Sequence, residues 1–495
     1  MLLTTLPHDI LILVLQHLPV QGLATLSITC RSLHDLITEF GWKGHLRTNP
    51  RPSYSLSRAR AHWSPRTQVR YDVLTDCAWS RSEFIARPLS RPWSGKMQPI
   101  LAINSSRLVV AAGPSIYSYK FGDSKGDESP PLSLEGFFSF TRPHGRQSDI
   151  TAITFIDDGG LDQTLHVGFQ DGRVQRVTFD PPSPNAPAGT TLRFTSSATS
   201  ELRDGDFLES LTSERNLLLS LSSSGSATLT DLHKPTSPPS TISLDARSWA
   251  SHMCLHASGP YAAFGTSSLY PLRIHSITDD QLMPTPSAIL YSTSSSNMSY
   301  QPSSSAVYGI SQGPVASPWG ASPQILVAGW FDGQVCCYDL RSSSRIAAGS
   351  GPGPVPLRPV LSLADPLQLE SIYSVSCGGG SASHIAAGSA RHSVVSFWDV
   401  RSPRTGWSVH APGNDRSPVY SIILESSRLF GATQSRPFVY DFGPGVTSST
   451  YPSLPEAQGI DGLKRKKGSI GYYVTKYPHT TRISTDRHER ELRTI

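Results

Sequence analysis

The amino-acid sequence predicts a mainly β protein built from small repeated sheets and preceded by a short unit of three helices. Charged residues make up only 16% of the 495 residues, whereas 40 prolines and 39 glycines interrupt the chain. This composition disfavours long helical segments and favours turn-rich β structure. A module of short apolar strands recurs after residue 95, and helical periodicity is concentrated in the first forty residues.

The distribution of charge bears on which partners the protein binds. Nine basic and four acidic residues between Asp461 and Ile495 account for the whole net charge of +5. The remaining neutral body lacks the clustered cations that bind nucleic-acid phosphates. The apolar run from Ile10 to Leu15 is too short to span a bilayer and follows an acidic residue, unlike a signal peptide. We therefore expect no nucleic acid and no membrane among the partners.

The sequence offers no catalytic or metal-binding constellation. It lacks a phosphate-binding P-loop, a dinucleotide fingerprint and a zinc-protease motif, and its sixteen histidines are scattered. One G-x-S-x-G match, from Gly309 to Gly313, is followed by Pro314 where a nucleophile elbow needs a helix. The cysteines contain no C-x-x-C pair and suit a reducing compartment; they are Cys30, Cys77, Cys254, Cys336, Cys337 and Cys377. We expect no enzyme activity, metal or cofactor, and a cytoplasmic or nuclear location.

Three short helices are expected between Leu6 and Trp42. In the first, Ile10, Leu13, Val14 and Leu18 share one side, but Leu11, Ile12 and Leu15 occupy the opposite side, so this helix is apolar nearly all round. A unit of about forty residues rarely covers two apolar faces by itself. A partner protein is therefore expected. The alternative is that these faces dock on the chain's own large domain.

The same segment resembles an F-box, on the residues Leu6-Pro7-His8-Asp9-Ile10, Leu18-Pro19 and Cys30-Arg31-Ser32-Leu33. This resemblance implies binding to the adaptor subunit of an SCF-type ubiquitin ligase, and through that adaptor to a cullin. The residues expected to face the adaptor are Leu6, Pro7, Ile10, Leu13, Val14, Leu23, Leu26, Cys30 and Leu33.

The repeated module is clearest in two copies, which end in Tyr338-Asp339-Leu340-Arg341-Ser342 and Trp398-Asp399-Val400-Arg401-Ser402. Each ending follows a strand of small residues that closes in glycine. Fainter copies give seven units between residues 97 and 442, about 49 residues each. A small strand meander cannot cover both its faces, so neighbouring units must stack, and radial closure removes most exposed sheet edges.

These endings and their spacing resemble WD-repeat β-propellers. The expected fold is thus a seven-bladed WD-type β-propeller preceded by a small three-helix F-box domain. The expected divisions are an F-box domain at 1–45, a partly helical connector at 46–95, the propeller at 96–442 and a basic tail at 443–495. A latch strand is expected within Trp79 to Leu89, and a returning strand at Gly471 to Tyr477. Lys464 to Lys467 would serve nuclear import, contact an acidic partner, or remain a solvated tail.

The resemblance puts substrate binding on the propeller rim, at the hairpin turns. These turns carry Arg173, Arg391, His392 and Arg436, whose arginines could pair with phosphate or carboxylate groups of an extended peptide. The alternative is solvated rim residues. The function expected is that of a non-catalytic substrate-recognition subunit, with a protein substrate that is phosphorylated or unmodified. The alternatives are a WD-repeat scaffold without a ligase role, and an enzyme, which would need converging acids or histidines on the rim.

Overall fold

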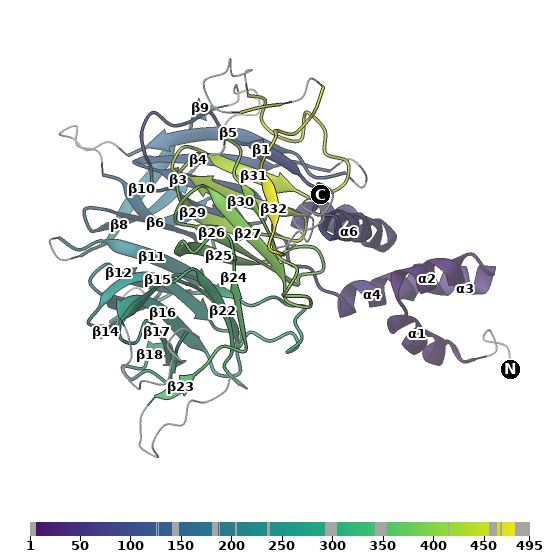
Figure 1. The fold of residues 1–495 in the computed structure, drawn as a ribbon, viewed down its shortest axis with the longest axis horizontal. Coiled ribbons are helices and arrows are strands. Elements are labelled where there is room, and N and C mark those ends of the chain that lie inside the picture. Colours follow the sequence, from purple (N-terminus) through teal and green to yellow (C-terminus); the bar gives the residue numbers. More distant parts are fainter. Residues whose placement is uncertain are drawn as a thin grey trace, which may run out of the picture.

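The computed structural model is mainly β, with its helices in the N-terminal part of the chain (Figure 1). It describes residues 6–124, 126, 128–140, 148–180, 187, 189–202, 205–234, 238–292, 304–341, 354–413, 415–454, 463–465 and 468–480. The helical elements are α1 (His8–Gln16), α2 (Val20–Ser27), α3 (Arg31–Leu36), the π-helical turn η2 (Ile37–Gly41), α4 (Trp42–Thr48), α5 (Ser57–His62) and α6 (Pro65–Ser80).

The strands that the structure describes form predominantly antiparallel sheets. The first sheet contains β2 (Ile100–Ile103), β3 (Arg107–Ala112), β4 (Ser115–Phe121), β5 (Leu132–Ser139) and β9 (Thr190–Thr191). The second contains β6 (Ile150–Phe155), β7 (Thr164–Phe169), β8 (Arg173–Phe179) and β10 (Phe194–Glu201). The third contains β11 (Leu208–Glu214), β12 (Leu217–Ser222), β13 (Ser226–Asp231) and β14 (Ser240–Ser243).

The remaining strands belong to a ten-stranded sheet and to two smaller ones. The ten-stranded sheet contains β15 (Arg247–Cys254), β16 (Tyr261–Ser268), β17 (Leu272–Thr278), β18 (Gln281–Leu282), β19 (Ala288–Leu290), β20 (Ser305–Gln312), β21 (Ile325–Trp330), β22 (Gln334–Asp339), β23 (Val355–Leu357) and β24 (Leu361–Ala364). The next contains β25 (Ile372–Gly378), β26 (His384–Ser389), β27 (Val394–Asp399), β28 (Trp407–His410) and β32 (Lys476–Pro478). The last contains β29 (Val419–Leu424), β30 (Arg428–Thr433), β31 (Pro437–Asp441) and β1 (Ile85–Pro88).

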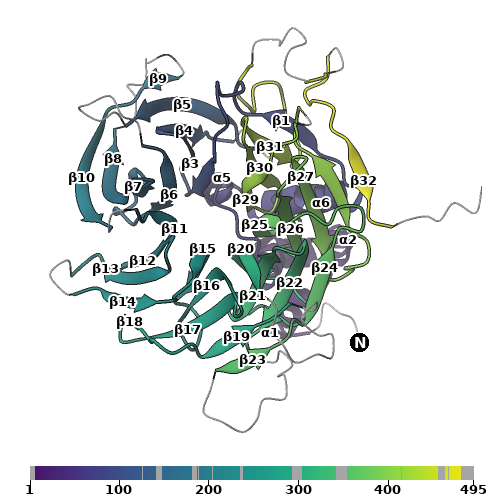
Figure 2. The same cartoon turned by 60° about the vertical axis from the view of Figure 1, so that its left-hand side comes forward.

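The sheets are arranged as a ring around a centre lined by one strand from each strand group (Figure 2). In chain order, β2, β6, β11, β15, β20, β25 and β29 each contact the next, and β29 contacts β2. The ten-stranded sheet divides into two such groups, because β16 and β20 pair only at Ser267↔Ala306 and Ser268↔Ser305. Radial stacking buries apolar side chains between neighbours: Leu108 and Val110 of β3 share a core with Phe430 and Val439 of the last sheet.

The repeated aromatic-Asp endings have a common local structure. Asp339 accepts hydrogen bonds from the backbone N–H and the Nε of Arg341, at 3.0 and 2.9 Å. Asp399 accepts the same pair from Arg401, at 3.0 Å each. A carboxylate that binds the N–H two residues later closes an Asx-type turn. The repeat therefore marks the point at which the third strand of a group ends and turns.

Both ends of the chain add strands to the ring. β1, which lies within the segment expected to latch the last blade, pairs antiparallel with β31 from Ile85↔Asp441 to Pro88↔Phe438. β32 extends the neighbouring sheet by pairing with β28. The tail also crosses the N-terminal segment, where the N–H of Tyr472 donates to the carbonyl of Ala86 at 2.9 Å. Lys464 and Arg465 are exposed, while Lys466 and Lys467 lie outside the described residues.

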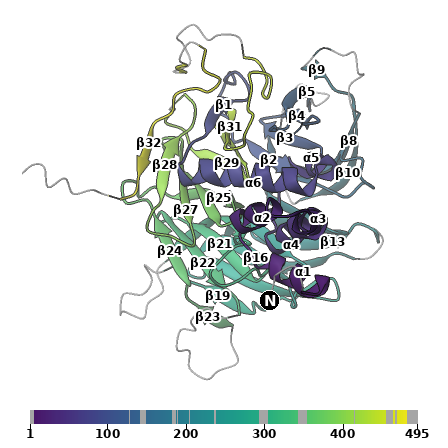
Figure 3. The ribbon, with the colours of Figure 1, turned by 90° about the vertical axis from the view of Figure 1, so that its right-hand side faces the viewer.

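Helix α6 packs against the helical unit and the ring at once (Figure 3). Its start is capped by Ser64, whose hydroxyl accepts the N–H of Thr67 at 3.1 Å, and Pro65 occupies the first turn. Val69 is buried in the core of the small helices. Trp79, at the other end, stacks on Phe442 with ring centroids 3.7 Å apart.

Two further contacts fix α6 on the ring. The indole N–H of Trp79 donates to the carbonyl of Ser426 at 3.0 Å. The hydroxyl of Tyr71, which is fully buried, donates to the hydroxyl of Ser427 at 3.1 Å. Burial raises the pKa of Tyr71 to about 12, so the phenol stays protonated and keeps its donor at neutral pH. The helix is therefore held by apolar packing and by satisfied buried polar groups.

Trp79→Ala is expected to lower the free energy of unfolding by roughly 3–5 kcal/mol, because it removes a large buried side chain and leaves a cavity. The matched control is Leu74→Ala on the same helix, where the side chain is 40% exposed and the cost should stay near ~0.5 kcal/mol. Urea denaturation of the full chain measures both. Equal effects of the two substitutions would show that Trp79 does not anchor α6.

Candidate functional site

The N-terminal helical unit has an apolar core, to which α6 contributes, and an uncovered apolar face. Leu11 and Leu15 of α1 pack with Leu23, Ile37 and residues of α4 and α6. On the other side of α1, Ile10, Leu13 and Val14 are 45%, 55% and 40% exposed. The ring therefore does not cover this face. An apolar face of this kind on a folded protein is typical of a protein-interaction surface.

The structure separates the residues expected to face an adaptor into three groups. Pro7, Ile10, Leu13, Val14 and Cys30 are exposed, and Leu6 and Leu26 are half-buried. Leu23 and Leu33 are buried within the helical unit, so they support its fold rather than contact a partner directly. The exposed members together define the outer face of the unit.

Sequence analysis did not anticipate two exposed apolar residues of the helical unit. Ile28, at the end of α2, is 84% exposed. Phe40, which a regular helix would place on the same side as Leu33 and Leu36, is 39% exposed. The cause is the π-helical turn η2 after α3, which shifts the angular positions of the following side chains relative to a regular helix. A π turn has no reliable sequence signal.

A partly buried ion cluster joins the connector to α6. The guanidinium of Arg51 contacts the carboxylate of Asp76 through two nitrogens, each 2.7 Å from an oxygen. Arg60 contacts Asp72 at 3.0 Å, and Arg51 lies 3.7 Å from the same carboxylate. Bidentate arginine pairs of this kind fix geometry as well as charge. The loop before α5 is thus tied to α6.

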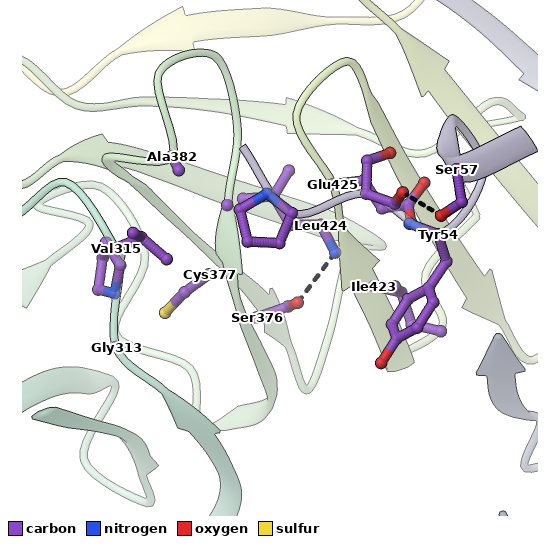
Figure 4. A pocket seen from close by; sticks show the side chains of 14 residues that line it. Tyr54, Ser57, Gly313, Val315, Ser376, Cys377, Ala382, Ile423, Leu424 and Glu425 are labelled. Carbon is purple, nitrogen blue, oxygen red and sulfur yellow. Dashed lines mark hydrogen bonds between the residues drawn. The ribbon is translucent and has the colours of Figure 1, made fainter. Parts of the chain in front are cut away.

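Glu425 ties the same loop to the ring. Its carboxylate accepts hydrogen bonds from the N–H of Tyr54 at 2.5 Å and of Ser55 at 3.1 Å, and from the Ser55 hydroxyl. Glu425 is 2% exposed, and burial raises the pKa of its carboxyl. A pocket of about 450 Å³ adjoins this contact, between the loop and the strand ends of the ring (Figure 4). Pro52, Tyr54, Val315, Cys377 and Leu424 are among its lining residues.

The rim residues expected to bind substrate lie in turns between the second and third strands of their groups, and they differ in accessibility. Arg173 pairs with Asp171 at 3.0 Å and covers the ring of Phe169. Arg436 is 5% exposed. Arg391 has a side chain 70% exposed, 3.7 Å from Glu370, and His392 is exposed. The turns therefore leave Arg391 and His392 open to solvent, whereas Arg436 is enclosed.

These turns and the connector lie at opposite ends of the ring strands. The connector contacts the turns between first and second strands, through Ser106 and Glu425. A hairpin reverses the chain at each turn, so turns between second and third strands fall at the other end. The helical unit and the expected rim therefore occupy opposite faces of the ring.

The described residues contain no group of three or more histidine, cysteine, aspartate or glutamate side chains that could hold a metal ion. All six cysteines are free thiols, and Cys336 and Cys337 are fully buried in β22. Ser311 of the G-x-S-x-G match lies within β20 and donates to the carbonyl of Gln312. None of the helices in the described segments combines the length and apolar character needed to span a membrane.

Comparison with known proteins identifies the helical unit. Residues 3–46 match the family model described as F-box-like. No curated protein matches the chain. Among solved structures the chain is similar to one described as "Structure of U3-55K", at 14% identity and a TM-score of 0.46, over 72% of this chain and 98% of that one. The N-terminal unit of this mainly β protein is F-box-like.

Glu425→Ala is expected to release the loop around Tyr54 and Ser55, because three donors lose their buried acceptor at about 1–3 kcal/mol each. Hydrogen exchange at the Tyr54 and Ser55 amides should accelerate while exchange in the ring strands stays slow. Glu83→Ala, at an exposed carboxylate, is the control. Unchanged amide protection in the Glu425 variant would mean that other contacts hold the loop.

Proposed function

We propose that this chain is an F-box/WD-repeat receptor subunit of an SCF-type ubiquitin ligase. In this proposal the N-terminal helices bind the ligase adaptor, and through it a cullin, while the ring holds a protein substrate. The observation that carries it is the uncovered face formed by Ile10, Leu13 and Val14 on an F-box-like unit. F-box proteins typically act as substrate receptors, so catalysis would take place on other subunits.

We further propose that the ring is a seven-bladed WD-type β-propeller with blades within residues 96–442. The closed order of inner strands from β2 to β29 supports seven blades, once the ten-stranded sheet is divided where β16 meets β20. The turns at Asp339 and Asp399 support the WD-repeat character. Free cysteines support a reducing compartment, and we place the protein in the cytoplasm or nucleus.

The geometry supports a receptor role because helix α6 connects the F-box-like unit to the ring. Helix α6 is buried in the core of the F-box-like unit at Val69 and in the ring at Trp79. A stiff connection of this kind holds a bound substrate at a fixed distance from the adaptor, which raises the effective concentration of its lysines near the conjugating enzyme. The rim lies on the face away from the helices and so stays accessible.

Ile10→Asp with Leu13→Asp is expected to weaken adaptor binding at least tenfold, because buried apolar anchors dominate such interfaces and the charges would be buried unpaired. Binding of the purified full chain to the SCF adaptor is measured by calorimetry. Leu161→Asp, at a leucine 62% exposed on the ring, is the matched control and should bind normally.

Two results would contradict the proposal. Adaptor binding that survives the double aspartate substitution would mean that this face is not the interface. Absence of binding by the unaltered chain would favour the alternative of a WD-repeat scaffold without a ligase role.

A further inference from the structure

A β-bulge recurs near the start of successive inner strands. The pairing register shifts at the same relative place in β6, β11, β15, β20, β25 and β29. The bulged residues are Thr151, Glu209, Trp249, Tyr308, Tyr373 and Tyr420. Bulges re-aim side chains and are frequent beside binding sites.

Four consecutive bulges carry aromatic side chains, and these make one continuous row, the aromatic arc: Trp249, Tyr308, Tyr373 and Tyr420. Ring centroids lie 5.0 Å apart for Trp249 and Tyr308, and 5.3 Å for Tyr308 and Tyr373. The centroids of Tyr373 and Tyr420 are 5.9 Å apart. Each residue belongs to a different inner strand, and all four are only half-buried. The arc therefore follows the inside of the ring across four strand groups and stays open to solvent.

The arc lies at the mouth of the ring that faces away from the helical unit. The connector and its pocket touch the far ends of the same strands, at Cys377 of β25 and Leu424 of β29. At the arc end the neighbouring Phe331 is 56% exposed, with its ring 6.5 Å from that of Tyr308. One mouth is thus occupied by the connector, and the other carries partly exposed aromatic side chains.

The arc already holds a cation. The guanidinium of Arg247 lies 4.0 Å from the ring centroid of Trp249 and pairs with the carboxylate of Glu209. The faces of aromatic rings carry partial negative charge, so they attract cations and disfavour anions. Farther along the arc, burial raises the pKa of Tyr373, and the charge of Glu370, three residues earlier in the chain, contributes to the same direction. A second carboxylate therefore lies close to the arc.

We propose that the aromatic arc binds an extended substrate segment that presents arginine or lysine, with the cation over Tyr308 and Tyr373 and paired with Glu370. This inference rests on the proposed receptor function and names its substrate class. In this proposal Arg391 does not bind the substrate. It lies 3.7 Å from the carboxylate of Glu370, so an incoming cation would compete with Arg391 for this carboxylate.

The test uses immobilised full-length protein and pools of random nonapeptides with a fixed central arginine, lysine, proline, leucine, glutamine or phosphoserine. We expect the arginine and lysine pools to be retained at least fivefold over the leucine and glutamine pools. Tyr308→Leu with Tyr373→Leu should abolish this preference, because leucine keeps the bulk but removes the π face. The corresponding phenylalanine pair should retain it. Tyr473→Leu, at an exposed tyrosine of the tail, is the matched control.

Arg391→Ala discriminates between cation and anion recognition. If a substrate cation competes with Arg391, this variant should bind the arginine pool as well as the unaltered chain or more strongly. Preferred retention of phosphoserine that is lost in Arg391→Ala would overturn the proposal in favour of anion binding. Preferred retention of proline would overturn it in favour of an uncharged aromatic groove.

Adaptor binding distinguishes failure of the arc from failure of the ligase role. The tyrosine variants should bind the SCF adaptor normally, which also verifies that they are folded. If the unaltered chain binds the adaptor but does not prefer the arginine and lysine pools, the proposed role of the arc is refuted. The receptor function then still stands. Retention of the cationic pools without adaptor binding would support the arc and refute the ligase role.

Discussion

The structure depends on one helix that is buried at both ends in different bodies. The small N-terminal helices do not close their own core, since Val69 of α6 completes it. The ring receives the other end of α6 through Trp79 and Tyr71. Because both contacts lie on one continuous helix, each body constrains the orientation of the other. Whatever binds the outer face of α1 is thereby held in a defined position relative to the ring.

Closure of the ring gives the protein two unlike mouths. The connector occupies one, where Glu425 holds the backbone of Tyr54 and Ser55. At the other, six of the seven inner strands begin with bulges, whose residues are polar in β6 and β11 and aromatic in β15, β20, β25 and β29. A bulge bends its strand and redirects the side chain, and at four of these positions the redirected side chains form the aromatic arc. The two mouths differ because the connector contacts one end of the ring strands and leaves the other end open.

The sequence predicts the broad architecture because its signals are local. Aromatic-Asp endings such as Trp398-Asp399 mark turns that are made by residues two apart in the chain. The apolar pattern of α1 likewise predicts a helix with two apolar sides. It cannot predict which side is buried, because that choice is made by tertiary contacts with later helices, including those of Ile37 and Trp42. The resemblance places Leu23 and Leu33 among the adaptor-facing residues, and the structure buries both within the helical unit.

Features that depend on distant contacts escape sequence reasoning. Glu425 and Tyr54 are 371 positions apart, and no pattern connects them. The aromatic arc depends on bulges, which break the period of two by which strand residues are assigned to a face. Arg436 resembles an exposed turn residue in the sequence, yet tertiary packing leaves it 5% exposed. Accessibility of rim residues is therefore a property of the closed ring rather than of any one turn.

The most direct test of a rigid joint is the distribution of distances between spin labels on the two bodies. Exposed Cys30 labels the helical unit, and Leu161→Cys labels the ring, in a background where Cys77 and Cys377 are replaced by serine. Double electron–electron resonance on the free protein should give one narrow distance distribution. A broad or multimodal distribution would contradict the account, because it would mean that the helical unit moves independently of the ring.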